Sequence, residues 1–245
     1  KLSHWNTVSI FDYGRTEDGT FYYVMEYLPG LSLADLVSRF GPLPVSRAIH
    51  LLRQICRALY EAHGVGLVHR DIKPANIFVS RLGGVCDVAK LLDFGLVELT
   101  VSDAKVEKAK AGISGSPRYM SPEQAIPYNV PDARSDIYSV GATAYYLLTG
   151  RVPFEGQTLA QVMMAHSREP LVPPSRHRAE VPSDVDEVVI KCLAKRPVDR
   201  FADAHSLEQA LAACSDADGW TDAQAAGWWQ EHLESDRDNG ATSKK

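Results

Sequence analysis

The distribution of hydrophobic residues along the chain changes from a strand pattern to a helical pattern near residue 30. Residues 8–13 and 21–27 are rich in β-branched and aromatic side chains, and the polar stretch 14–20 lies between them. This pattern predicts a hairpin of two strands. From Leu31 onward the hydrophobic residues recur mainly at helical spacing, so we expect a small β part followed by a larger helical part.

Several stretches of the helical part are distinct. Hydrophobic residues recur at helical spacing over 45–62, directly after Pro44, which suits the front of a helix. The stretch 135–148 is apolar almost all round, which is typical of a helix buried in a core. Ser183 and Asp186 form a capping-box signature ahead of a third helix. This and a fourth helix are expected over 185–195 and 204–213, and short strands over 66–68, 77–80 and 90–92.

The tail from residue 215 is acidic and polar, apart from three tryptophans. Trp220 and Trp228 are eight residues apart with Ala223 between them, so one helical face could dock two indoles. Packing on the main domain is favoured over a partner site. The composition of residues 236–245 is typical of a disordered end.

Composition and charge exclude several functional classes. The 245 residues carry 26 Lys and Arg against 31 Asp and Glu, a formal net charge of −5, which argues against a nucleic-acid-binding protein. No hydrophobic stretch is long enough to span a membrane. The four cysteines are scattered without a C-x-x-C pair, which favours reduced thiols and a cytoplasmic location.

Three motifs follow one another in the middle of the chain. His69-Arg70-Asp71-Ile72-Lys73-Pro74-Ala75-Asn76 fits the pattern H-R-D-L-x-x-x-N with Ile in place of Leu, and Asp93-Phe94-Gly95 and Ser121-Pro122-Glu123 come after it. A single triplet is weak evidence, but the three in this order are specific. Through them the sequence resembles a eukaryotic-type serine/threonine protein kinase domain of the bacterial kind.

The resemblance implies an α+β, protein-kinase-like fold with a mainly helical lower lobe and two strands of the upper lobe. It divides the chain into a remnant of the upper lobe with the hinge, the lower lobe, and a tail with a tryptophan-containing helix and a disordered end. The corresponding residues are 1–30, 31–213 and 214–245.

The resemblance also assigns roles in phosphate transfer from ATP to protein hydroxyls. Asp71 would accept the proton of the substrate hydroxyl, and Lys73 would reach the γ-phosphate. Asn76 and Asp93 would ligate Mg²⁺. Ser116 stands where the family has a threonine that bridges the catalytic aspartate and lysine, so it is expected to support catalysis.

The nucleotide would lie against the hinge. By resemblance Met25 is the gatekeeper, and the backbone of Glu26 and Leu28 pairs with the adenine edge. Phe78 closes the adenine from below, and Ser32 follows the hinge in the same set.

Other motif residues are expected to be structural. Asp136 matches a buried aspartate that braces the catalytic loop, and Glu123 and Arg200 match an ion pair of the lower lobe. His69 matches a structural histidine near Phe94.

Two questions about function stay open at this point. The sequence contains no Gly-rich loop, strand lysine or helix glutamate of the family, and residues 2–8 resemble the linker that follows that helix. A fragment of an active kinase, inactive by itself, is therefore weighed against a pseudokinase that binds partners without catalysis. Separately, Ser114, Ser102 and Thr100, in falling order, are the expected phosphorylation sites, and Arg70 is expected to bind the phosphate group carried there.

Overall fold

The structure, a computed structural model, describes residues 2–92, 116–126 and 130–234. In these ranges helices outnumber strands, and the strands lie in the first 91 residues, which agrees with the expected α+β class. The α-helices are α1 (Leu33–Phe40), α2 (Val45–Gly64), α5 (Ala133–Thr149), α6 (Leu159–Arg168), α7 (Ser183–Cys192), α8 (Ala204–Ala212) and α9 (Asp222–Trp229). The strands are β1 (Ile10–Arg15), β2 (Phe21–Met25), β3 (Gly30–Ser32), β4 (Ile77–Leu82) and β5 (Val85–Leu91).

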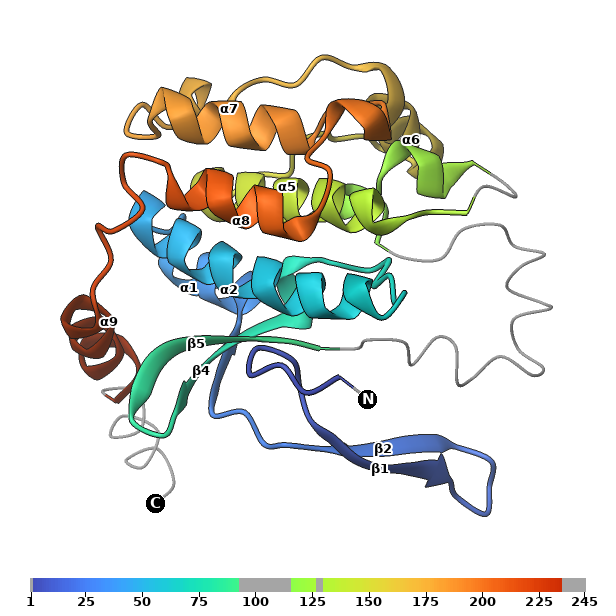
Figure 1. The fold of residues 1–245 in the computed structure, drawn as a ribbon, viewed down its shortest axis with the longest axis vertical. Coiled ribbons are helices and arrows are strands. Elements are labelled where there is room, and N and C mark those ends of the chain that lie inside the picture. Colours follow the sequence, from blue (N-terminus) through green and yellow to red (C-terminus); the bar gives the residue numbers. More distant parts are fainter. Residues whose placement is uncertain (1, 93–115, 127–129, 235–245) are drawn as a thin grey trace.

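The helices are stacked in layers above the strands. In Figure 1, α7 lies uppermost, α5 and α8 form the next layer, and α1 and α2 lie below them. Strands β4 and β5 run beneath α2, and the β1–β2 hairpin extends away from the helical part. None of the helices in the described ranges is both long and apolar enough to cross a membrane.

The strands form two antiparallel sheets. Strands β1 and β2 pair as the expected hairpin, although β1 begins two residues later than predicted and β2 ends at Met25. The second sheet has the order β3-β4-β5. The predicted short strands 77–80 and 90–92 are the two ends of one hairpin, which turns at Gly83 and Gly84 with positive φ angles of 57° and 85°. The strand predicted over 66–68 is wrong, because that stretch has no strand.

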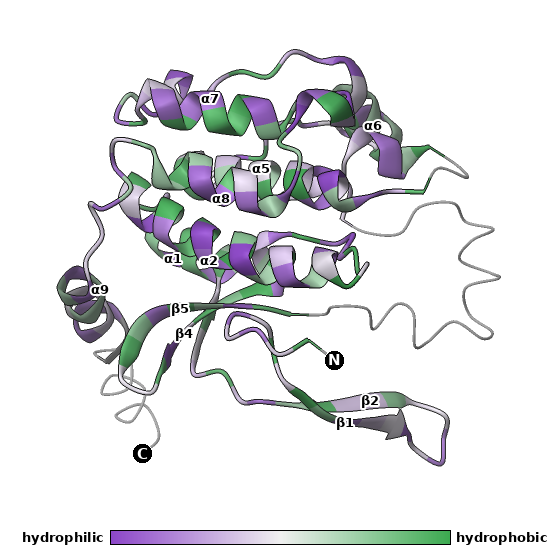
Figure 2. Ribbon diagram, viewed as in Figure 1, coloured by the Kyte–Doolittle hydropathy of each residue, from purple (hydrophilic) through white to green (hydrophobic). Residues whose placement is uncertain are grey.

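Helix α5 is the centre of the helical part, as its apolar sequence predicts. Asp132 caps its first turn by accepting a hydrogen bond from the Arg134 N–H, and Gly150 ends it with a φ of 71°. A Cβ on Gly141 would lie 2.4 Å from the Cys192 Cβ, so the glycine lets α5 and α7 approach closely. Figure 2 shows hydrophobic and hydrophilic colours on α2, α7 and α8, as amphipathic helices carry, whereas almost every residue of α5 is buried.

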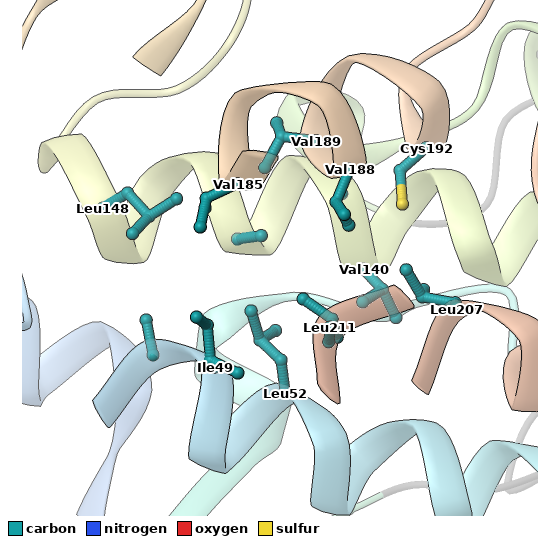
Figure 3. A pocket seen from close by; sticks show the side chains of 13 residues that line it. Ile49, Leu52, Val140, Leu148, Val185, Val188, Val189, Cys192, Leu207 and Leu211 are labelled. Carbon is teal, nitrogen blue, oxygen red and sulfur yellow. The ribbon is translucent and has the colours of Figure 1, made fainter. Parts of the chain in front are cut away.

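Between these four helices the core is almost filled. Figure 3 shows the apolar side chains that meet there, and the cavity they enclose is about 10 Å³, no more than one water molecule requires. The packing is therefore dense enough to hold α5, and the residues at its first turn, in one position.

Two features of the helical part differ from the sequence prediction. The capping box of Ser183 and Asp186 is wrong, because α7 already begins at Ser183, behind Pro182. Asp186 instead accepts hydrogen bonds from the backbone N–H and the hydroxyl of Ser175, which ties the preceding loop to the helix. Helix α6 was not predicted, and it starts with a capping box of Thr158 and Gln161.

The tail packs on the domain, as favoured by the sequence, but with a different geometry. Helix α9 starts at Asp222 behind the cap residue Thr221, so Trp220 precedes the helix and does not share a helical face with Trp228. Trp229 is buried, and α9 lies beside the β4–β5 hairpin (Figure 1).

Candidate active site

The loop that carries the first motif is held from the core by Asp136. This aspartate lies in the first turn of α5, and its side chain is fully buried. Its carboxylate accepts hydrogen bonds of 2.8 Å from the backbone N–H groups of His69 and Arg70 and from Nε2 of His63. Arg70 has a φ of 67°, an uncommon backbone conformation for a residue with a side chain, which these bonds stabilise. The predicted brace is confirmed.

His69 has a structural position in the same loop. The ring is buried, and Nε2 lies 2.7 Å from the carbonyl oxygen of Leu92, to which it can only donate. Nδ1 is then the acceptor of the Asp71 backbone N–H at 3.3 Å. The ring therefore joins the loop to the end of β5. Its expected neighbour Phe94 lies outside the described residues.

Asp71 lies at the centre of a group of polar side chains. Lys73 Nζ donates to Asp71 Oδ2 at 2.7 Å and to Ser116 Oγ at 2.8 Å. The backbone N–H of Ser116 donates to Asp71 Oδ1 at 3.1 Å, so both carboxylate oxygens have a fixed partner. The Asp71 side chain remains 29% exposed, which leaves it reachable from solvent. Asp71, Lys73 and Ser116, which the resemblance predicts to be bridged, therefore lie in hydrogen-bond contact.

Asn76 completes this group from the short 3₁₀ helix Pro74–Asn76. Its Nδ2 donates to the backbone oxygen of Asp71 at 2.9 Å and to Asp71 Oδ2 at 3.1 Å. Its backbone oxygen accepts the N–H of Leu92 at 2.9 Å, which ties the 3₁₀ helix to the end of β5. The second expected metal ligand, Asp93, lies outside the described residues.

The side-chain orientation of Asn76 suits a ligand of magnesium. Because Nδ2 is fixed by Asp71, the side-chain oxygen Oδ1 is the atom left to face a cation. Mg²⁺ prefers oxygen ligands and keeps several water or phosphate oxygens, so few protein ligands are required. Within the described ranges no three His, Cys, Asp or Glu side chains are grouped as a metal cluster would need.

The residues predicted to face the nucleotide lie at the end of β2 and on β4. Glu26 donates its N–H to the backbone oxygen of Ser9 at 3.0 Å, so only its carbonyl remains for an adenine edge. Leu28 is buried in a small cluster with Val8 and Leu92, against which Phe78 packs. Phe78 on β4 thus lies close to the hinge residue Leu28, as the predicted pocket requires.

The two remaining residues of the nucleotide set have different surroundings. Met25 ends β2 and is 38% exposed. Ser32 is buried and caps α1. Its hydroxyl oxygen accepts a hydrogen bond from the Asp35 N–H at 3.0 Å, and the hydroxyl donates a hydrogen bond to Asp35 Oδ2 at 2.6 Å. The Ser32 hydroxyl is therefore already used within the chain.

Lys90 was missed by the sequence analysis, although it supports the hinge. It is almost fully buried on β5 and donates to Glu26 Oε1 at 2.9 Å, while the same oxygen accepts the Ser9 N–H at 2.8 Å. The Trp5 ring lies 5.0 Å from its ammonium group. A lone lysine inside the apolar run from Val88 to Leu92 was the available signal, because a buried charge needs a partner.

The third motif is anchored by an ion pair. Arg200 NH1 and NH2 donate to the two carboxylate oxygens of Glu123 at 2.6 and 2.8 Å, and Ser135 Oγ donates to Glu123 Oε1 at 2.7 Å. The predicted Glu123–Arg200 pair is thus confirmed. Burial by itself would raise the pKa of Glu123, but the hydrogen bonds from Arg200 and Ser135 outweigh it and lower the pKa below its usual value.

Gln124 connects this motif to the catalytic loop. Its Nε2 donates to the backbone oxygen of Arg70 at 2.8 Å, and its Oε1 accepts the Ser121 N–H at 3.1 Å. The sequence analysis did not single out this glutamine. Its role in the structure is to hold the segment around Ser121 against the loop that carries Asp71.

Comparisons with known proteins give a consistent result. A family model described as the protein kinase domain matches residues 1–212. The chain is 39% identical over 217 residues to the serine/threonine-protein kinase pkn3 of Myxococcus xanthus, and 38% identical over 213 residues to PknB of Mycobacterium tuberculosis. These matches cover 87% and 86% of this chain and 40% and 33% of the relatives, so the chain spans well under half of their length.

Solved structures are similar as well. The kinase domain of Mycobacterium tuberculosis PknI aligns with a TM-score of 0.65 and 25% identity, over 86% of this chain and 72% of that one. A crystal structure of Rad53 in complex with AMP-PNP aligns with a TM-score of 0.69 and 25% identity, over 85% of this chain and 50% of that one.

Proposed function

The chain belongs to the protein kinase family, and from this premise we propose that the protein transfers the γ-phosphate of ATP to serine and threonine hydroxyls of other proteins. The similar solved kinases confirm the expected protein-kinase-like fold. The observation that carries the proposal is the geometry at Asp71. Its two carboxylate oxygens are held by Ser116 and Lys73, and Lys73 also bonds the Ser116 hydroxyl.

Asp71 is proposed as the acceptor of the substrate proton. A hydroxyl that binds its partly exposed carboxylate would be oriented for attack in line on the γ-phosphate. Lys73 would stabilise the charge that develops on the transferred group, and its bond to Ser116 keeps the ammonium group in place. Asn76 would keep Asp71 oriented through Nδ2 while Oδ1 faces the metal.

The nucleotide is proposed to bind between the hinge and β4. The free carbonyl of Glu26, the backbone of Leu28 and the Phe78 ring support this placement, with Met25 and Ser32 at its edges. Asn76 and Asp93 would hold Mg²⁺, which when bound neutralises charge on the phosphates. The four free thiols suit a reducing compartment, and we propose a cytoplasmic location for this part of the protein.

Catalysis by these 245 residues alone is proposed to be slow. Their sequence has no G-x-G-x-x-G loop and lacks the family's strand lysine and helix glutamate, which hold the phosphates. Positioning and electrostatics supply most of the acceleration in phosphoryl transfer, so an incomplete phosphate site costs orders of magnitude.

The test is a phosphate-transfer assay from labelled ATP to a protein substrate. It compares this chain, the chain extended by its natural upstream residues, and each form with Asp71→Asn. We expect activity in the extended form that Asp71→Asn removes, and little in the short form. Equal, background-level transfer by the extended form and its Asp71→Asn variant would instead identify a catalytically silent binding module.

A further inference from the structure

Asp87 on β5 is a second fully buried carboxylate, and it has no part in the proposed active site. Each of its oxygens accepts two hydrogen bonds. Oδ2 accepts from Arg47 Nε and Trp220 Nε1, both at 2.8 Å. Oδ1 accepts from Arg47 Nη2 at 2.8 Å and from Trp229 Nε1 at 2.7 Å. A carboxylate offers about four acceptor sites, so Asp87 is saturated.

Arg47, the ionic partner of Asp87, is enclosed by the same tail. Its side chain is 1% exposed, although it lies in the first turn of α2. The Trp228 ring lies 3.8 Å from the guanidinium carbon, and the Trp220 ring lies 5.1 Å from it. Such contacts between a cation and an aromatic face are strongest where water is excluded.

The tail helix also packs on α1. The Trp228 ring meets Phe40 edge to face at a centroid distance of 5.1 Å and stacks on His232 at 4.7 Å. Phe40, Arg47 and Asp87 therefore form one surface, which we name the Asp87 surface, and residues 220–232 cover it. Its three residues come from α1, α2 and β5.

Half of the donors to Asp87 come from outside the part of the chain that the kinase family model matches. Arg47 and Asp87 lie within residues 1–212, whereas Trp220 and Trp229 lie beyond them. Asp87 has a φ of 56°, which is uncommon for a residue with a side chain. Such a backbone conformation persists only where the surrounding structure holds it. Without residues 220–232, Asp87 would keep Arg47 and have two acceptor sites with no protein donor, so the domain alone presents an incomplete binding site for two N–H donors.

We propose that the Asp87 surface is a peptide-docking site for a segment that presents two tryptophan indole N–H groups to one carboxylate, and that residues 220–232 occupy it as a non-covalently docked segment of the same chain. The indoles fit this role, because each supplies one donor and a large apolar face. The surface lies at the hairpin end of β4–β5, and Figure 1 shows α9 there, whereas β5 leaves towards the candidate active site at its other end. Docking there leaves Asp71 accessible.

The first test uses a labelled synthetic peptide of residues 218–234 and measures its binding to the full chain by fluorescence anisotropy. In the unmodified chain the tethered tail competes with the peptide at an effective concentration near the millimolar range, so binding is weak. Changing Trp220→Phe and Trp229→Phe together removes the two N–H donors and keeps an aromatic ring, smaller than the indole, at each position. We expect the peptide to bind this variant at least about tenfold more tightly than the unmodified chain.

Controls separate docking from general effects. Trp5→Phe makes the same chemical change at an indole outside the Asp87 surface and should leave peptide binding as in the unmodified chain. Adding Asp87→Asn to the doubly substituted chain should abolish binding, and circular dichroism verifies that each variant is folded. Equal binding to all variants, or none to the doubly substituted chain up to about 1 mM peptide, overturns the proposal.

A second measurement needs no variant. In the unmodified chain, the indole N–H protons of Trp220 and Trp229 should exchange with solvent much more slowly than that of Trp5, and they should exchange together, because both are released when the segment undocks. Exchange of either proton as fast as that of Trp5 contradicts the docked segment.

Discussion

The loop around Asp71 and the tail around Trp229 are each organised by one buried carboxylate, but the two carboxylates differ in what they bind. Asp136 accepts two backbone N–H groups and His63, all from residues 63–70. Asp87 accepts four side-chain N–H groups, from Arg47 and from two tryptophans more than 130 residues away in the chain. The first arrangement fixes the shape of a loop, and the second fixes the place of a separate segment.

This difference has a mechanical consequence. The loop that Asp136 holds is anchored at both ends, by α2 and by β4, so losing the carboxylate leaves the buried N–H of His69 in place without its acceptor. The tail contacts the domain through side chains of residues 220–232, so its release would let water reach Arg47. We therefore expect the two sites to respond differently to the same chemical change.

The largest expected effect is that of Asp136→Ala. It removes the shared acceptor of three donors, of which the His69 N–H is buried and the other two are partly buried, so the free energy of unfolding should fall by about 4 kcal/mol. Urea denaturation followed by circular dichroism measures this. Thr143→Val on the same buried helix keeps the side-chain volume and should change stability little. A loss below about 1 kcal/mol for Asp136→Ala would contradict the comparison.

Glu123→Gln should rank second and should depend on pH. The pKa of Glu123 is lower in the folded chain than in the unfolded chain, so its ionised form contributes stability above the unfolded value of about 4.5, and this is lost as pH falls through the folded value. At neutral pH the variant should lose about 3 kcal/mol by leaving Arg200 without its buried partner. Denaturation at several pH values should show a smaller acid dependence for Glu123→Gln than for the unmodified chain.

Asp87→Ala should be less destabilising than Asp136→Ala, with a loss of about 2 kcal/mol. The change leaves Arg47 without its ion pair, but undocking of the tail exposes the guanidinium to water and limits the cost. Tryptophan fluorescence should shift to longer wavelength before the helical signal is lost in urea. Coincident transitions by fluorescence and by circular dichroism would show that the tail does not detach by itself.

The smallest effect is expected for Glu208→Gln. Arg53 and Arg57 on α2 both donate to Glu208 Oε1 on α8, at 3.0 and 2.8 Å, but the Arg57 side chain is 52% exposed. Such pairs contribute little in water, so the loss should be about 0.5 kcal/mol and should diminish in high salt. A loss of stability equal to that of Asp87→Ala would mean that burial does not decide how much an ion pair contributes to the stability of this chain.

The sequence alone determined the elements whose residues are close together in the chain. The apolar stretch 135–148 and the periodic stretch 45–62 predicted α5 and α2, because a helix buries residues that recur along one segment. The motif residues Asp71, Lys73 and Asn76 were identified for the same reason, since the chemistry of one short loop is written in consecutive positions.

Only the tertiary structure decided the partners that come from distant segments. Asp186 was taken for a helix cap, but it binds Ser175, because the choice between local and distant donors depends on packing. Asp87 is an ordinary charge in the sequence and Lys90 stands out only by its apolar neighbours, whereas the partners of both appear only where β5 meets the hinge and the tail. Hydrophobic periodicity specifies which face of a segment is buried, whereas the partner of a buried charge is set by which segments fold against that face.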